Sequence, residues 1–338
     1  MDWMRRRRAA GKILLLAVLP AMAFLLAVSV GRYPAGIAQL PGALHTLLTG
    51  GELDPAQLTL VRLRLPRIIL AMLVGGALAL SGAAYQGLFQ NPVVSPDLLG
   101  ASSGASFGAS LAILLGAGSL GVQAASFCAG VLAVALAAGM DRLLSRRSVS
   151  AVHLILCGML VSSLFNALLS FVKFAADPET KLPAITFWLM GSFSGASLAD
   201  LRIFWLFLPA CALLLMVRWR LNILAMGDEE ARMLGVNVRA SRYLIIACAT
   251  LLTSLSVSVS GNIGWVGLVA PHFARMLVGA DYGKLLPASM ALGGAFLLLV
   301  DTAARALLTV ELPLSVLTAV IGAPFFFLLL LRGKRGFL

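Results

Sequence analysis

The chain has 338 residues, of which 60% are hydrophobic and only 12% are charged, with a net charge of +12. Its mean hydropathy of +0.97 excludes a water-soluble domain, because soluble folds need more polar surface than this chain has. The basic excess does not indicate nucleic-acid binding, since no basic stretch is interleaved with base-stacking aromatic residues. Basic residues of membrane proteins instead mostly mark cytoplasmic loops.

Ten apolar segments follow one another along the chain, each of about the length that crosses a bilayer core as a helix. Lipid offers no partner to an unpaired backbone amide, and the alternation typical of an outer-membrane barrel is missing. The sequence therefore predicts an all-α polytopic membrane protein, with about ten transmembrane helices in a single domain over residues 1–338. The expected spans are 13–31, 66–85, 96–115, 119–140, 151–173, 201–218, 241–260, 265–278, 286–307 and 313–331.

The first segment resembles a signal peptide, because four arginines at 5–8 precede the apolar run 13–30. That run is long for a signal peptide, and residues 31–34 give no clear cleavage site, so we expect an uncleaved first helix. The third and eighth segments are short and rich in Gly, Ser or Pro, which is typical of partial or broken spans.

The distribution of basic residues predicts the orientation. With the N-terminus inside, eighteen of the 26 basic residues fall on the inner side, which favours ten spans with both termini in the cytoplasm. Residues 219–240 are then cytoplasmic. The basic residues on the outer side are Arg32, Arg62, Arg64, Arg67, Lys173, Lys181, Arg202 and Arg305.

No pattern in the chain indicates catalysis or a bound cofactor. The three Gly-Lys pairs are not followed by Ser or Thr, so there is no phosphate-binding loop, and no nucleophile elbow occurs. The histidines are isolated, and the four cysteines lie singly in apolar runs without metal-ligand spacing. We therefore expect neither a catalytic site nor a metal site in this polypeptide.

One acid within a span is a candidate for ion coupling. Asp301 lies four residues before Arg305, on the same helical face near the outer end of the ninth span. Other acids within the spans are scarce, so a local ion pair is favoured over a proton relay.

Three arginines lie at the outer mouth of the second span: Arg62, Arg64 and Arg67. Basic residues are normally scarce on the outer side, so their presence there needs an explanation. They either reach toward lipid phosphates or form a docking patch for an acidic partner, because arginine binds carboxylates through two hydrogen bonds. The residues alone leave both explanations open.

Residues 227–238 form a polar stretch, GDEEARMLGVNV. Its three acids favour the start of a short helix, and Gly235 can close it. We expect Ala231 and Leu234 to share one face. A helix this short is not stable alone, so it is either a solvated loop helix or a helix pressed into a cleft of a cytoplasmic partner.

Five segments occur in this order: GLFQNPVVSPDLLGASSGASFGA (87–109), FWLMGSF (187–193), AMGDEEARMLGVNV (225–238), GNIGWVGLVAPHFAR (261–275) and ELPLSVLTAVIGAPFFFLLL (311–330). Together they closely resemble the FecCD family, the permeases of bacterial ABC importers for iron–siderophores, haem and cobalamin. Ser315 stands where the family pattern has a glycine. The resemblance implies a ten-helix subunit of the bacterial cytoplasmic membrane that pairs with a second permease copy. It also implies two cytoplasmic ATPase subunits, which bind ATP and Mg, and a periplasmic or lipid-anchored binding protein.

Site residues follow from the resemblance by motif position. Segment 224–240 is implied to couple to the ATPase, and a short helix at about 183–193 is implied to border the outer path. The implied coupling residues are Gly227, Asp228, Glu229, Glu230, Ala231, Arg232, Leu234 and Gly235. The implied cytoplasmic gate is Asn91, Pro92 and Val93; the implied docking residues are Arg64, Arg67 and Arg305; the implied outer-path residues are Trp188, Met190, Gly191 and Ser192.

The expected function is therefore an ATP-driven import permease for a ferric siderophore, or for haem or cobalamin. A secondary carrier that uses no ATP is the alternative, and a polytopic membrane enzyme would need a polar cluster that is not visible. His272 is either a packed histidine or a contact to haem iron. Whether the permease pair is identical or mixed stays open.

Overall fold

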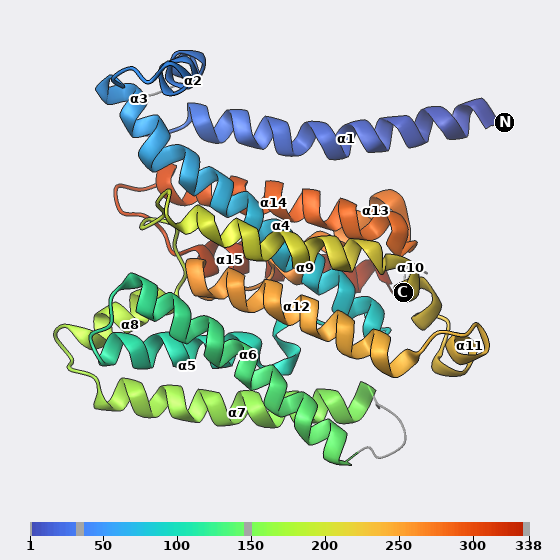
Figure 1. The fold of residues 1–338 in the computed structure, drawn as a ribbon. Helices are drawn as coiled ribbons and strands as arrows, with labels where there is room; N and C mark the ends of the chain where they lie inside the picture. Colours follow the sequence, from blue (N-terminus) through green and yellow to red (C-terminus); the bar gives the residue numbers. More distant parts are fainter. Residues whose placement is uncertain (1, 32–36, 145–150, 334–338) are drawn as a thin grey trace.

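The computed structural model describes the chain except residues 1, 32–36, 145–150 and 334–338, and its described part is helical (Figure 1). Arg32, Arg146, Arg147, Lys334 and Arg335 of the charge count lie outside the described residues. The elements are α1 (Asp2–Ser29), α2 (Gln39–Thr49), α3 (Pro55–Thr59), η1 (Leu60–Arg64), α4 (Leu65–Leu88), η2 (Pro96–Leu99), α5 (Ala101–Leu114), α6 (Ser119–Leu144), α7 (Ala151–Ala175), α8 (Lys181–Leu189), η3 (Asp200–Ile203), α9 (Phe204–Met216), α10 (Arg218–Leu224), α11 (Asp228–Met233), α12 (Val238–Ser260), α13 (Val266–Val278), α14 (Tyr282–Ala306) and α15 (Leu314–Gly333).

All ten expected spans are helical. Among the described residues, five helices are long and apolar enough to cross a membrane, and the 49° bent pair α9–α10 makes a sixth if it is one span. The other four apolar helices have 10–17 residues and lie in α1, α5, α13 and α15. The short third and eighth spans are α5 and α13. Helix α13 begins directly after Trp265, whose φ of +69° stops a helix from continuing through it.

The second span begins earlier than expected. A continuous helical path runs from Pro55 through the π-helical turn η1 into α4, and the span Pro55–Leu88 has 34 residues. Asp54 starts it with a capping box, in which its carboxylate accepts from the backbone of Gln57 at 2.7 Å. The expected start at residue 66 was wrong because the polar and basic residues before it hide the helix from a hydropathy reading.

Helix α4 lies in the middle of the bundle, against α12, α13 and α14 (Figure 1). Its glycines allow this close packing. A Cβ on Gly82 would lie 1.8 Å from the carbonyl oxygen of Gly267, and one on Gly75 would lie 2.3 Å from that of Gly293. Small residues let helix backbones approach in a membrane, so α4 is the element around which the others are arranged.

The bundle has two ends (Figure 1). At one, here called the termini end, α1 begins, α15 ends and α11 projects beyond the long helices. At the other, here called the α8 end, lie α2, α3 and α8. The expected gate and coupling residues lie at the termini end, and the expected docking and path residues lie at the α8 end.

Candidate functional site

Arg67 is the centre of an ion-pair cluster at the α8 end. Its Nε donates to both carboxylate oxygens of Asp301 at 3.0 and 3.1 Å, and its Nη2 donates to Asp301 Oδ1 at 2.9 Å. Its Nη1 and Nη2 also donate to Glu311 at 2.8 and 3.0 Å. One guanidinium thus binds two carboxylates, each through both of its oxygens. This bidentate geometry is the strong form of an arginine–carboxylate pair.

The other two expected docking residues join this cluster through α1. Arg64 donates to the carbonyl of Val28 at 2.8 Å, and Arg305 donates to the carbonyl of Ala27 at 2.6 Å. These carbonyls lie in the last turn of α1, where a helix leaves its carbonyl groups without partners and where its dipole favours cations. Satisfying a helix end is a role for outer arginines that the sequence did not suggest.

The expected local ion pair is present but is not the main one. Arg305 Nε lies 3.8 Å from Asp301 Oδ2, whereas Arg67 reaches the same carboxylate at 2.9 Å. All three expected docking arginines line one cavity of about 360 Å³, together with Glu311 and residues of the loop after α8. Arg62 is exposed and does not line it. The docking role of the three stays a prediction.

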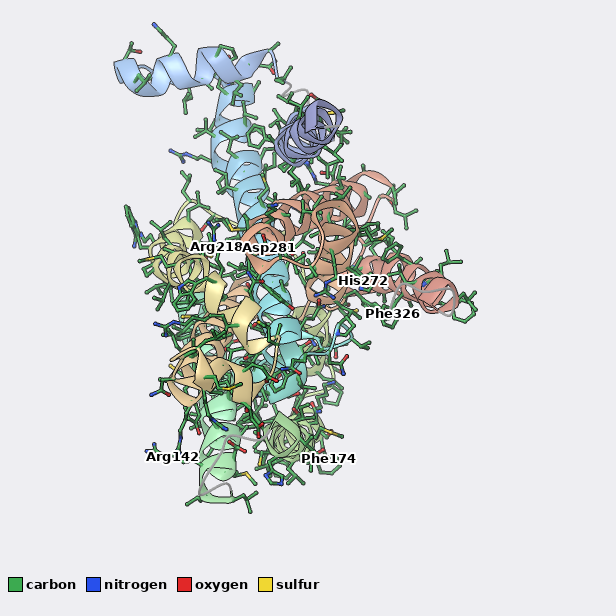
Figure 2. The ribbon with its side chains drawn as sticks, turned by 90° about the vertical axis from the view of Figure 1, so that its right-hand side faces the viewer. Arg142, Phe174, Arg218, His272, Asp281 and Phe326 are labelled. Atoms are coloured by element: carbon green, nitrogen blue, oxygen red, sulfur yellow. The ribbon has the colours of Figure 1, made fainter. Side chains whose placement is uncertain are left out.

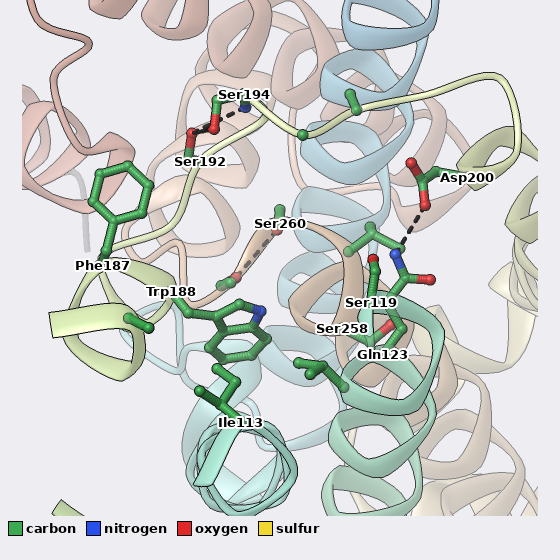
Figure 3. Close-up of a pocket in the computed structure, with 16 residues that line it drawn as sticks. Ile113, Ser119, Gln123, Phe187, Trp188, Ser192, Ser194, Asp200, Ser258 and Ser260 are labelled. Atoms are coloured by element: carbon green, nitrogen blue, oxygen red, sulfur yellow. Dashed lines mark hydrogen bonds between the residues drawn. The ribbon is translucent and has the colours of Figure 1, made fainter. Parts of the chain in front are cut away.

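A second cavity, of about 410 Å³, lies at the same end, between α8, the loop after it, the start of α6 and the end of α12 (Figure 3). Trp188 and Ser192 line it as expected of outer-path residues, whereas Met190 and Gly191 do not. Sequence reasoning missed Gln123 and Asp200, which form a 2.8 Å hydrogen bond there. It also missed Ser258 and Ser260 of α12 and Ser194 of the loop after α8, which line the same cavity. Serine in an apolar helix is usually a packing residue, so no signal in the sequence pointed to them.

Met190 and Gly191 join three helices instead. Their carbonyls accept from the backbone of Ser315 and Leu314, both at 3.1 Å, at the start of α15. The next amide, that of Ser192, donates to the carbonyl of Ser260 at the end of α12 at 2.9 Å. A Cβ on Gly261, whose φ is +69°, would lie 2.3 Å from the Trp188 carbonyl oxygen, so only glycine fits this junction.

The expected gate residues form the turn that follows α4 at the termini end. Asn91 Oδ1 accepts from the Val93 amide at 3.0 Å, and the Val93 side chain is exposed. The preceding residue, Gln90, has a φ of +51° and donates to the carbonyl of Leu224 at 2.7 Å. The turn is therefore fastened to the end of α10, three residues before the expected coupling helix.

Helix α11 begins with the three acids and ends as expected. Gly235 has a φ of +77°, and its amide donates to Arg232 while that of Val236 donates to Ala231, the hydrogen bonds of a glycine-closed helix end. Asp228 binds Arg242 of α12 at 2.7 Å.

Ala231 and Leu234, which the sequence predicts to share a face of the helix, differ in burial. Ala231 is fully buried, whereas Leu234 is 60% exposed and Met233 is 79% exposed. The amide of Leu234 still donates to the Glu230 carbonyl at 3.0 Å, so Leu234 is in helical register, and its exposure reflects its place at the end of the helix.

Helix α10 is also fastened to α14. Asn222 donates to Asp281 at 2.8 Å and accepts from the Tyr282 amide at 2.8 Å. The hydrogen bond from Asn222 and that from the Gly283 backbone lower the pKa of Asp281, and Arg218 adds to this from α10. Figure 2, seen from the termini end, shows Arg218 and Asp281 next to each other.

No group of three or more His, Cys, Asp or Glu in the described part of the chain is placed to hold a metal ion. His272 lies on α13, and its Nδ1 is buried with no hydrogen-bond partner among the described residues. A contact of this histidine with haem stays a prediction.

Comparisons with known proteins cover nearly the whole chain. The model of the FecCD transport family matches residues 16–332. The molybdate import system permease protein MolB of Haemophilus influenzae is 42% identical over 95% of this chain and 95% of its own. The probable iron chelatin transport system permease protein of Helicobacter pylori is 40% identical over 84% of this chain and 85% of its own. A solved structure of a metal-chelate type ABC transporter in an inward-facing conformation matches with a TM-score of 0.85 at 40% identity. The match covers 95% of this chain and 99% of the solved chain.

Proposed function

Since the chain belongs to the FecCD transport family of ABC importer permeases, we propose that its cargo is a ferric siderophore or a similar metal chelate. The likeness to a metal-chelate type transporter over almost the whole chain carries this proposal. The membrane is the bacterial cytoplasmic membrane, and both termini are cytoplasmic, because the inner segments hold most of the basic residues.

Helix α11 is the contact for a separate ATPase. It projects beyond the bundle at the termini end (Figure 1). Met233 at its end is exposed, as are Met226 just before the helix and Leu234 just after it. Exposed apolar side chains in a water-facing loop favour a protein partner. The chain itself lacks a phosphate-binding loop, so ATP and Mg bind to that partner.

The contacts around α10 connect this helix to the gate turn. A movement of α11 is transmitted to α12 through the ion pair between Asp228 and Arg242. It is transmitted to the gate turn through the hydrogen bond from Gln90 to the Leu224 carbonyl. Packed helices change between discrete arrangements and do not deform continuously. We infer that ATP-driven closure of the ATPase pair moves this connected unit and opens or closes the path at residues 91–93.

A second permease copy and a binding protein complete the importer. Helices α6 and α7 have apolar stretches that are only 33% and 28% buried, against 83% for the span that contains α4, so their outer faces are available to a second copy or to lipid. The cavity with Arg64, Arg67 and Arg305 is the docking place for acidic side chains of the binding protein.

The test is reconstitution in liposomes with the cognate ATPase and binding protein. Uptake of a ferric siderophore, haem, cobalamin and molybdate is measured side by side, with and without ATP inside. We expect ATP-dependent uptake of the ferric siderophore. Uptake driven by an ion gradient without the ATPase would instead support the secondary-carrier alternative.

Molybdate is the second candidate cargo, because the relative MolB is named for molybdate import. The cluster at the α8 end has three arginines and two carboxylates, so it carries excess positive charge that would not repel an oxyanion. Uptake of molybdate, with no uptake of any chelate in the same liposomes, would replace the siderophore proposal.

A further inference from the structure

The docking arginine at the centre of the cluster is already occupied. A guanidinium has five N–H donors, and the N–H groups of Arg67 bind the carboxylates of Asp301 and Glu311 at 2.8–3.1 Å. An acidic side chain of a partner therefore cannot bind Arg67 in the two-bond geometry unless one of these carboxylates leaves.

The two carboxylates differ in how easily they can leave. The Asp301 side chain is fully buried on α14, and moving it away would leave buried positive charge uncompensated. The Glu311 side chain is 34% exposed and belongs to the segment between α14 and α15. An ion pair with one partly exposed member costs little to open, because water replaces its contacts. Glu311 is the exchangeable partner.

Glu311 is also close in sequence to the backbone that holds the outer mouth. The amides of Leu314 and Ser315 donate to the carbonyls of Gly191 and Met190, and the amide of Leu312 donates to Ala304 at 3.1 Å. The ion pair of Glu311 thus helps to hold the start of α15 against the loop after α8. Releasing Glu311 removes one of the attachments of this segment.

We propose that Glu311 is an internal substitute for the acidic partner, which occupies Arg67 in the undocked permease. A carboxylate of the docking binding protein displaces it, and the displacement loosens residues 307–315 and their hold on the loop after α8. Docking and opening of the outer mouth are thereby coupled through one exchange of carboxylates. This inference rests on the proposed docking role of Arg67.

The first test measures the affinity of the binding protein for the complete importer in nanodiscs. Glu311→Gln keeps the size of the side chain but removes its charge, and we expect it to tighten docking about threefold to tenfold, because the internal competitor is weakened. Glu179→Gln is the matched control, since Glu179 is an exposed carboxylate in the loop before α8 at the same end. Docking that is unchanged or weaker in Glu311→Gln would overturn the inference.

A charge reversal separates this inference from the docking proposal. If Arg67→Glu leaves docking unchanged, the proposed docking role of Arg67 is wrong. If Arg67→Glu weakens docking but Glu311→Gln does not tighten it, only the carboxylate exchange is wrong. Should Glu311→Gln fail to assemble, Glu311→Asp shortens the carboxylate by one methylene and is expected to tighten docking by a smaller factor; no tightening contradicts the exchange.

Hydrogen exchange of backbone amides separates this proposal from a structural role of Glu311. If Glu311 only stabilised the fold, exchange would not change when the binding protein docks. In the wild-type importer, we expect the amides of Leu314 and Ser315 to exchange faster once the binding protein docks. In Glu311→Gln they should exchange fast already, and docking should change them little. Equal protection in the free and docked wild-type importer would rule out the release of this segment.

Discussion

At the α8 end, buried charged side chains depend on their ion-pair partners. Asp301 is completely buried and lies between two arginines, Arg67 at 2.9 Å and Arg305 at 3.8 Å. A buried charge is tolerated only when it is paired and hydrogen-bonded, so Arg67 depends on a carboxylate 234 positions away in the sequence.

Asp301→Asn keeps the shape of this side chain but removes the charge that compensates Arg67 and Arg305. We expect the free energy of unfolding to fall by up to about 3–5 kcal/mol, the range for breaking a buried ion pair. The melting temperature in detergent should fall by several degrees, whereas the exposed control Glu179→Gln should leave it unchanged. Equal melting of Asp301→Asn and wild type would mean that the arginines do not need this carboxylate.

Glycine is required at position 261 for two separate reasons, its φ of +69° and the 2.3 Å distance from a Cβ to the Trp188 carbonyl oxygen. Gly261→Ala should therefore destabilise the protein by about 1–3 kcal/mol, measured as a lower melting temperature. Gly264→Ala is the matched control, since a Cβ there meets nothing within 4 Å. A similar loss in both variants would show that the α8–α12 junction is not the cause.

Among the elements, α10 and α11 are short helices that depend on their attachments. Helix α11 has six residues and cannot be stable alone. Buried Ala231 and the ion pair between Asp228 and Arg242 hold it, which leaves Met233 and Leu234 facing outward. Such a helix can transmit movement because it is fastened on one side and exposed on the other.

Met233→Lys combined with Leu234→Lys should weaken the contact with the ATPase, because two exposed apolar side chains are replaced by charges. We expect about a tenfold loss or more in the affinity of ATPase binding, with the melting temperature of the permease unchanged. Glu179→Gln, an exposed substitution at the opposite α8 end, is the control. Full ATPase binding by the double variant would contradict the contact proposed for α11.

Gln90→Ala removes the hydrogen bond between the gate turn and the carbonyl of Leu224. We expect ATP hydrolysis to continue while uptake per ATP falls about twofold to tenfold, because α10 no longer moves the turn. The ratio of uptake to hydrolysis in liposomes measures this, with the exposed Glu179→Gln at the α8 end as the control. A normal ratio would show that the gate is moved by another route.

At the scale of the whole molecule, burial is uneven. The span that contains α4 is 83% buried in its apolar stretch, while the corresponding figures for α6 and α7 are 33% and 28%. One side of the molecule therefore leaves much of the apolar surface of α6 and α7 uncovered by the described part of the chain. Lipid can cover such faces, but a permease that encloses a path between two copies also needs an apolar face of this kind.

Native mass spectrometry of the importer, released from nanodiscs, should therefore show two permease chains with two ATPase chains. A complex with one permease chain and an active ATPase would contradict the paired arrangement. The same measurement distinguishes two identical permease chains from a mixed pair, since a paralogue would differ in mass.

Hydropathy and turn residues determined the ten helical segments, the weakness of α5 and α13, and the acid start and glycine end of α11, because these depend on neighbours along the chain. The tertiary structure alone decided that Arg67 binds partners 234 and 244 positions away, that Gly191 meets α15, and that Gln90 reaches α10. It also decided that Ala231 is buried while Leu234 is exposed. Pairings between distant residues depend on how helices pack around α4, and many packings satisfy the same local pattern, so only the folded bundle selects one.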